Sequence, residues 1–193
     1  MCLHLFYFLL EKTVKKKYNI NVGGKTIMFN KGETVIHRSS GALIVNDIVS
    51  KDFGLGLMNY YYLTPKFPNK TNQSLEMYLP EDSAALYIRQ PITKEQANNL
   101  VVAIPSMEKI WITDAKERKK KFEEIYYSGD VKGLCQLVKM LYVSEDFFAK
   151  PMSLTDKSFL SRIRSNIFEE FAVALDITPE EVEKYISIHL GQE

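Results

Sequence analysis

The hydrophobic pattern of this chain changes its period once, near Pro91, and the change divides the expected fold into two parts. Before Pro91, apolar residues form short runs rich in β-branched and aromatic side chains, separated by Gly, Pro and Asn, which is typical of strands joined by turns. After Thr93 they recur at three- and four-residue spacings, the pattern of one apolar face on an α-helix. The pattern therefore predicts an α+β protein, with a small antiparallel β barrel followed by an all-α helical domain.

Local signals place the elements within each part. In the first part we expect strands over residues 34–38, 42–50, 58–63, 74–79 and 86–88. Prolines end the third and fourth strands because they have no N–H for a ladder, and Gly54-Leu55-Gly56 predicts a hairpin turn. In the second part we expect five helices, to about residues 104, 127, 141, 175 and 190. Their start signals are the capping residues Thr93, Thr113 or Asp114, Asp130, Ser153 and Thr178.

Residues 1–27 are set apart from both parts. Their apolar run precedes the lysines, the reverse of a signal peptide, and no cleavage site follows. Gly23-Gly24 can be encoded by a ribosome-binding sequence a short distance before the codon of Met28. We hypothesise that the natural protein starts at Met28 and that 1–27 is a non-native or disordered leader. The domains expected after it are a β domain over 28–92, a connecting helix and linker over 93–107, and a helical domain over 108–193.

Composition argues against several classes of protein. The two cysteines and three histidines have no metal-binding spacing, and no nucleotide-binding or hydrolase motif occurs, so we expect neither an enzyme nor a cofactor. Adjacent glutamates such as Glu169-Glu170 are expected to be solvated or capping groups, and Cys135 to be a buried small hydrophobe. No apolar run reaches the ~18 residues that span a bilayer. We therefore expect a cytoplasmic protein that is a monomer and makes no membrane contact.

Charge limits how this chain could bind DNA. Residues 106–193 carry thirteen basic and sixteen acidic side chains, and residues 28–105 carry seven of each. Without the leader the chain is slightly acidic, so bulk attraction to a polyanion is not expected. Any contact with DNA must come from a local patch.

Two stretches resemble the CarD family of bacterial transcription regulators. Met28-Phe-Asn-Lys-Gly-Glu-Thr-Val-Ile-His, followed by Ser40-Gly41-Ala-Leu-Ile-Val, resembles the family opening, F-x-x-G-D-x-V-V-Y before an H-G turn. Ser128-Gly-Asp130, Leu137-Val-Lys-Met-Leu-Tyr142, Met152-Ser-Leu-Thr-Asp-Lys157 and Glu170-Phe-Ala-Val-Ala-Leu175 resemble the helical half in order and spacing. The resemblance covers Met28 to about Leu190.

The resemblance implies a Tudor-like β domain that docks on the β subunit of RNA polymerase. It also implies a helical domain that contacts promoter DNA at the upstream edge of the transcription bubble. There a tryptophan acts as a wedge in the minor groove and stabilises the open complex.

Residues of this chain take these roles by position. Trp111, the sole tryptophan, matches the wedge, although it lies further from Ser128 than in the family pattern. The other expected DNA contacts are Lys116, Arg118, Lys119, Lys120, Lys121, Lys157, Arg162 and Arg164. For the polymerase, Lys51 matches a basic contact residue, Tyr78 replaces a family arginine, Arg38 is a further candidate, and strand 74–79 is a candidate docking edge.

Other interpretations stay open. Trp111 could pack between the two domains, and the lysines could form an ordinary solvated helix face. A protein-interaction adaptor of RNA polymerase without direct DNA binding is the second hypothesis, favoured by the net −3 of residues 106–193. A sequence-specific repressor would need a helix-turn-helix with base-reading side chains, which the sequence lacks.

Overall fold

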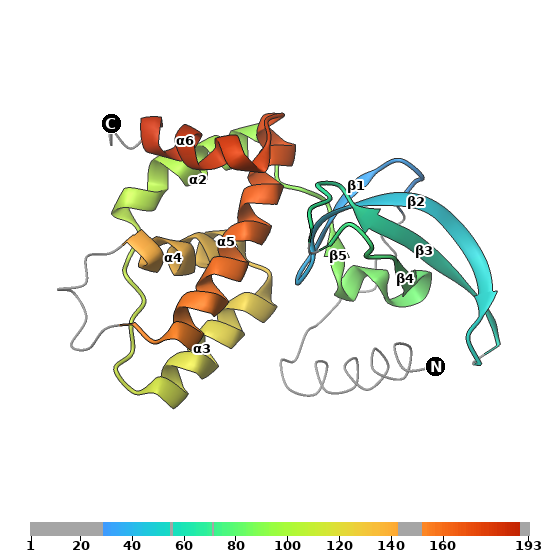
Figure 1. The fold of residues 1–193 in the computed structure, drawn as a ribbon, viewed down its shortest axis with the longest axis horizontal. Coiled ribbons are helices and arrows are strands. Elements are labelled where there is room, and N and C mark those ends of the chain that lie inside the picture. Colours follow the sequence, from blue (N-terminus) through green and yellow to red (C-terminus); the bar gives the residue numbers. More distant parts are fainter. Residues whose placement is uncertain (1–28, 55, 71, 143–151, 190–193) are drawn as a thin grey trace. The chain divides into compact units, whose positions relative to one another are not determined.

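The computed structural model describes residues 29–54, 56–70, 72–142 and 152–189. These form two compact units (Figure 1). The first, here called the β unit, contains the described residues up to His37 together with Leu43–Gln90. The second, the helical unit, contains Arg38–Ala42 and the described residues from Pro91 onward. The expected leader, the Met28 start and the predicted end at Leu190 lie outside the described residues.

A five-stranded antiparallel sheet forms the β unit. Its strands are β1 (Thr34–His37), β2 (Gly41–Asp52), β3 (Leu57–Pro65), β4 (Met77–Pro80) and β5 (Ile88–Arg89), in the order β4-β3-β2-β1-β5. In this order β4 and β5 are the edge strands. The predicted antiparallel sheet is confirmed, whereas its closure into a Tudor-like barrel is not. The β2–β3 hairpin turns where expected: Gly54 and Gly56 have positive φ, and Asp52 accepts both of their N–H groups.

Two strand predictions were wrong in detail. Leu86, expected in the fifth strand, ends the 3₁₀ helix η1 (Glu81–Leu86), which starts directly after Pro80. The Tyr87 N–H closes that turn on the Ala84 carbonyl, so strand β5 begins only at Ile88. The fourth strand begins at Met77 and not at Ser74, which lies in a turn.

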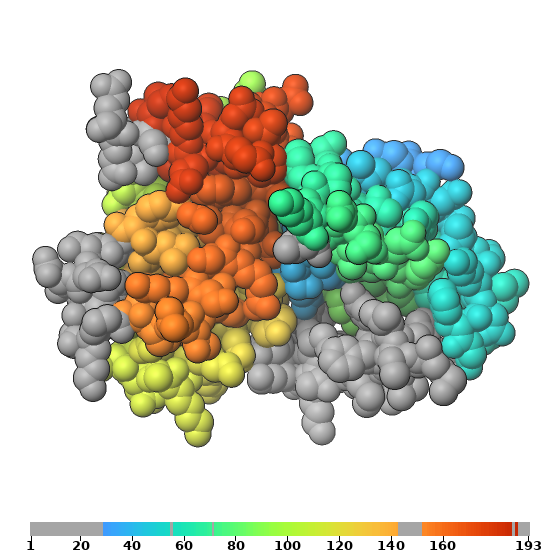
Figure 2. All heavy atoms as spheres, in the orientation of Figure 1, coloured from blue at the N-terminus to red at the C-terminus, as the bar shows by residue number. Residues whose placement is uncertain are grey.

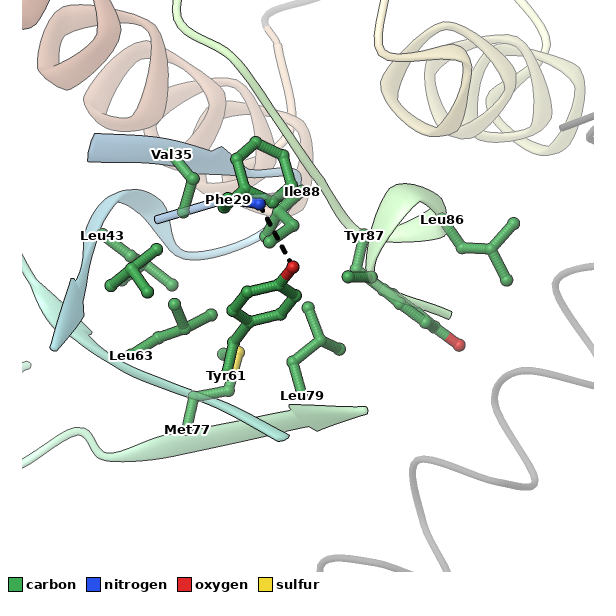
Figure 3. Packing of buried hydrophobic residues seen from close by; sticks show 12 residues of the cluster. Phe29, Val35, Leu43, Tyr61, Leu63, Met77, Leu79, Leu86, Tyr87 and Ile88 are labelled. Atoms are coloured by element: carbon green, nitrogen blue, oxygen red, sulfur yellow. Dashed lines mark hydrogen bonds between the residues drawn. The ribbon is translucent and has the colours of Figure 1, made fainter. Parts of the chain in front are cut away.

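The core of the β unit surrounds one tyrosine ring. Tyr61 of β3 is fully buried, and its hydroxyl oxygen accepts the Phe29 N–H at 3.1 Å, so the phenol is satisfied inside an apolar cluster (Figure 3). The cluster is formed by Phe29, Val35, Leu43, Val45, Tyr61, Leu63, Met77, Leu79, Ala84, Leu86, Tyr87 and Ile88. Alternation along β3 places Tyr61 and Leu63 on this face and Tyr60 and Tyr62 on the opposite, outer face, where Tyr60 is fully buried and Tyr62 half-buried.

Helices form the second unit. They are α2 (Lys94–Ala103), α3 (Ala115–Ser128), α4 (Val131–Lys139), α5 (Leu154–Leu175) and α6 (Pro179–His189), with 3₁₀ turns η2 (Ile104–Ser106) and η3 (Met140–Tyr142). The predicted caps are confirmed at Thr93, Asp114, Asp130 and Ser153, whose side chains accept N–H groups of the first turn. Gly129 ends α3 with φ of +72°.

Helix α5 is the centre of the helical unit, with α2, α4 and α6 packed against it. Its predicted core face is confirmed at Leu160, Ile163, Ile167, Phe171 and Leu175, which are buried, whereas Phe159 is half-buried. Cys135 on α4 is buried as expected, and burial raises the pKa of its thiol to about 12. No helix in the described part of the chain has the length and apolar character to cross a membrane.

The pair Glu169-Glu170 departs from the prediction. Glu170 is only 1% exposed and accepts the Ile92 N–H at 3.1 Å, so it is not a solvated group. Glu169 accepts the Ala42 N–H at 2.8 Å, and burial raises the pKa of its carboxyl to about 7. Both carboxylates therefore accept hydrogen bonds from backbone N–H groups outside their own helix.

Candidate functional site

The segment between η2 and α3 carries Trp111 and is held first by Lys139. The ammonium of Lys139, the last residue of α4, donates to the carbonyls of Pro105 and Met107, each at 2.7 Å. Burial and the charge of Lys109 lower the pKa of Lys139. The start of the Trp111 segment is therefore attached to the end of α4.

Arg118 holds the other end of the segment. Its Nη1 donates to the carbonyls of Ile112 and Thr113, at 2.6 and 3.1 Å, and its Nη2 donates to Asp156 Oδ2 at 2.8 Å. The Ser153 hydroxyl donates to the same Oδ2 at 2.7 Å. The guanidinium thus joins the first turn of α3, the first turn of α5 and the backbone just after Trp111.

Trp111 lies over this guanidinium. The guanidinium carbon of Arg118 is 4.2 Å from the centroid of the indole ring, within the range of a cation–π contact. The indole is half-buried, whereas Arg118 is 7% exposed. Because a charge-paired, buried guanidinium cannot reach a phosphate, Arg118 is separated from the lysines with which the sequence grouped it.

The four lysines of α3 remain exposed, and they divide into two sets. Lys116, Lys119 and Lys120 lie three and four residues apart, so they share one face of the helix. Lys121 lies on another side of the helix, and its Nζ is 3.3 Å from Oε2 of Glu124. Figure 2 shows the yellow-green atoms of α3 at the surface of the helical unit. Three lysines on one face are thus the cationic group that α3 presents.

The three candidates on α5 have different surroundings. Lys157 is exposed in the first turn, next to Asp156, and so lies at the helix end that Arg118 joins to α3. Arg162 packs against aromatic rings, with its guanidinium carbon 5.3 Å from the Phe159 centroid. Nη1 of Arg164 is 3.5 Å from Oε1 of Glu183 on α6. The pKa of Arg164 is raised, mainly by its hydrogen bond to the Tyr142 hydroxyl. Only Lys157 lies beside the Trp111 anchor.

On the β unit, the two residues matched to polymerase contacts meet each other. The Lys51 ammonium is 4.0 Å from the Tyr78 ring centroid, and Tyr78 stacks on Tyr62, its direct partner across β3 and β4, with centroids 5.1 Å apart. Phe53 at the hairpin end packs on Tyr60 and Tyr78 and is 41% exposed. We call Lys51, Phe53, Tyr60, Tyr62 and Tyr78 the aromatic strip; it ends at the edge strand β4.

Arg38, the third polymerase candidate, does not belong to this strip. It lies between β1 and β2, in the short segment that groups with the helical unit. Its charge acts on Tyr126 of α3, where it opposes the burial that raises the pKa of that phenol.

Sequence reasoning missed the two groups that hold the Trp111 segment in place. Lys139 was not singled out, and Asp156 was identified only as part of a helix start. Nothing local indicates their partners, since the bonds of Lys139 span 32 and 34 residues and the Arg118–Asp156 bond spans 38. Among the described residues no cluster of His, Cys, Asp or Glu could hold a metal ion.

The family described as CarD, C-terminal domain, matches residues 105–187. The helical unit carries a CarD C-terminal domain. No curated protein matches the chain.

The matched range contains both anchors of the Trp111 segment, the lysine face of α3 and all of α5. The resemblance to the CarD family is therefore confirmed for the helical half of the chain. The match does not include residues 28–92, so it does not show a polymerase-interacting role for the β unit.

Proposed function

We propose that this protein is a non-enzymatic bacterial transcription regulator that binds RNA polymerase through its β unit and promoter DNA through its helical unit. The CarD C-terminal domain over residues 105–187 is the observation that carries this proposal. In this function, the protein stabilises the open complex by contacting DNA at the upstream edge of the transcription bubble.

The DNA contact is supported by the combination of one ring and one cationic face. Trp111 is a large apolar ring, and apolar wedges act in the minor groove by filling a partly unstacked base step. Lys116, Lys119 and Lys120 follow on the next helix and would pair with phosphates, which gives affinity without sequence reading. Lys157 joins this set, because the bond from Arg118 to Asp156 brings its helix end to α3.

The polymerase contact is supported by the aromatic strip. Tyrosines are enriched where interfaces derive most of their energy, and Lys51 and Tyr78 adjoin one another at the edge strand β4. An edge strand offers backbone groups for pairing with a partner strand. Docking on the β subunit would raise the local concentration of a helical unit that binds DNA weakly by itself.

A second candidate function is a polymerase adaptor that does not touch DNA. The excess of acidic over basic side chains in residues 106–193 favours it, because that charge repels a polyanion at long range. The two functions differ in what Trp111 does.

The lifetime of the open complex distinguishes the DNA-contacting regulator from the adaptor. RNA polymerase is bound to a promoter with wild-type protein, with Trp111→Ala, or with neither, and dissociation is followed after addition of a competitor. The proposed function predicts that wild type lengthens the lifetime and that Trp111→Ala, which still binds polymerase, does not. An equal effect of both proteins would favour the adaptor, and no effect of either would overturn regulation of this step.

A further inference from the structure

We propose that Arg118 is a positioning residue, which holds the Trp111 indole in one orientation before DNA is bound. This inference rests on the function proposed above, because the orientation matters only if the indole makes a contact. It replaces the expectation that Arg118 itself binds phosphate.

The first step is the anchoring of the guanidinium. Three acceptors from two parts of the unit hold it: the carbonyls of Ile112 and Thr113, and Asp156 Oδ2, which the Ser153 hydroxyl holds in turn. A planar guanidinium with acceptors on both of its terminal nitrogens has little freedom to rotate.

The second step is the transfer of that order to the indole. A ring whose face lies over a fixed cation has fewer accessible rotamers than a ring exposed to water on both faces. Because Arg118 also holds the carbonyls of the two residues after Trp111, it fixes both the side chain and the backbone that carries it. An indole ordered in advance loses less conformational entropy when it enters a base step.

The third step distinguishes this role from a direct contact with DNA. Asp156 compensates the charge of Arg118, and the two side chains are only 8% and 12% exposed. An effect of Arg118 on promoter complexes must therefore be indirect, through the residues that it holds in place.

The indole itself reports on the inference, because Trp111 is the only tryptophan of the chain. In the free protein, Arg118→Lys keeps the positive charge and loses the planar fork. We expect lower fluorescence anisotropy and a higher acrylamide quenching constant, because an indole that is no longer held against a fixed cation moves more freely and is more accessible to the quencher. The matched control is Lys132→Gln on α4, an exposed side chain, which leaves both signals unchanged. Unchanged signals in Arg118→Lys, with the fold intact, would overturn the inference.

A double variant then separates positioning from a general loss of structure. On RNA polymerase open complexes, Arg118→Lys is expected to shorten the lifetime by about 2- to 5-fold. In the Trp111→Ala background the same change is expected to add nothing, because the residue through which it acts is gone. An equal further loss in that background would show that Arg118 acts on its own and would refute the positioning role.

The two proposals fail in different ways. If Arg118→Lys loosens the indole but Trp111→Ala leaves the open complex unchanged, the positioning contact stands and the proposed function fails. Should Arg118→Lys not fold by circular dichroism, Asp156→Asn is the second variant. It keeps an acceptor for Nη2 without the charge, and the indole is again expected to loosen; an unchanged indole signal there would count against the inference.

Discussion

Each unit of this protein places a cation over an aromatic ring, but the two cations are held differently. The distances are similar, 4.0 Å from Lys51 to the Tyr78 ring and 4.2 Å from Arg118 to the Trp111 ring. Arg118 is buried and donates three hydrogen bonds to acceptors around it. Lys51 is half-buried on the outer face of the sheet, where it also lies 5.9 Å from the Phe53 ring.

The difference follows from the chemistry of the two side chains. A guanidinium presents five donors in a rigid plane, so it can fix a backbone, a carboxylate and a ring together, whereas an ammonium is a point charge on a flexible stem. The helical unit therefore uses its cation to hold a ring in place. The β unit uses a ring to carry a cation that can still turn toward a partner.

Matched methionine variants test this comparison with the largest expected effect. Arg118→Met leaves Asp156 buried without its partner and is expected to lower the free energy of unfolding by about 3–5 kcal/mol. Lys51→Met removes only a surface cation–π contact and is expected to cost less than about 1 kcal/mol. Urea denaturation of each variant measures both values. Equal losses would show that the two cations are held alike.

The next effect concerns the partner of the aromatic strip. Tyr78→Ala removes the ring under Lys51 and is expected to raise the Kd for the RNA polymerase β subunit at least about 10-fold. Tyr62→Phe is the control, since it keeps the stacked ring and loses only the hydroxyl, which is bonded to Glu76. Affinity is measured by titration against the isolated subunit. Wild-type affinity in Tyr78→Ala would remove the strip from the docking surface.

The half-buried carboxylate of Glu169 gives the helical unit a pH dependence. Because the pKa of Glu169 is raised to about 7 from its ordinary 4.5, the folded protein holds a proton at pH values where the unfolded chain has released it. Its contribution to stability is therefore full below about pH 4.5 and is lost as the pH rises through 7. The free energy of unfolding of Glu169→Gln, minus that of wild type, should therefore be larger at pH 8 than at pH 4.5 by about 1–2 kcal/mol. The difference is no larger because water partly screens this side chain.

Chemical denaturation at the two pH values measures this change. Glu124→Gln, an exposed carboxylate on α3, is the control and is expected to show no such trend. A Glu169→Gln difference that stays constant between the two pH values would contradict the account.

The smallest effect separates the lysines of α3. Lys120→Ala is expected to weaken DNA binding by about 2- to 5-fold and to reduce the salt slope by about 1, because it removes one phosphate contact. Lys121→Ala is expected to change both quantities less, since its ammonium is 3.3 Å from Glu124. Salt titrations of the polymerase–promoter complex compare them. A larger effect at Lys121 would reverse the assignment of the two helix faces.

Local signals predicted most of the fold. The caps at Thr93, Asp114, Asp130 and Ser153 were found because a capping side chain acts within its own turn. Leu86 was misplaced, because a run of apolar residues does not distinguish a strand from a short 3₁₀ turn. Strand order depends on pairing between distant segments, which no local pattern reports.

The candidate site was predicted only in part. The resemblance identified Trp111 and the lysines, but it also placed Arg118 among the expected DNA contacts. Its burial depends on Asp156, 38 residues away, and on carbonyls that carry no sequence signal. The same reason hid Lys139, whose acceptors are backbone groups 32 and 34 residues distant.

Site-specific cross-linking tests the central claim most directly. A photoreactive phenylalanine derivative replaces Trp111 in one protein and Phe53 in another, and each is irradiated in open complexes. The account predicts that the probe at position 111 cross-links to DNA at the upstream edge of the bubble and the probe at position 53 to the polymerase β subunit. A probe at 111 that labels only protein would contradict it.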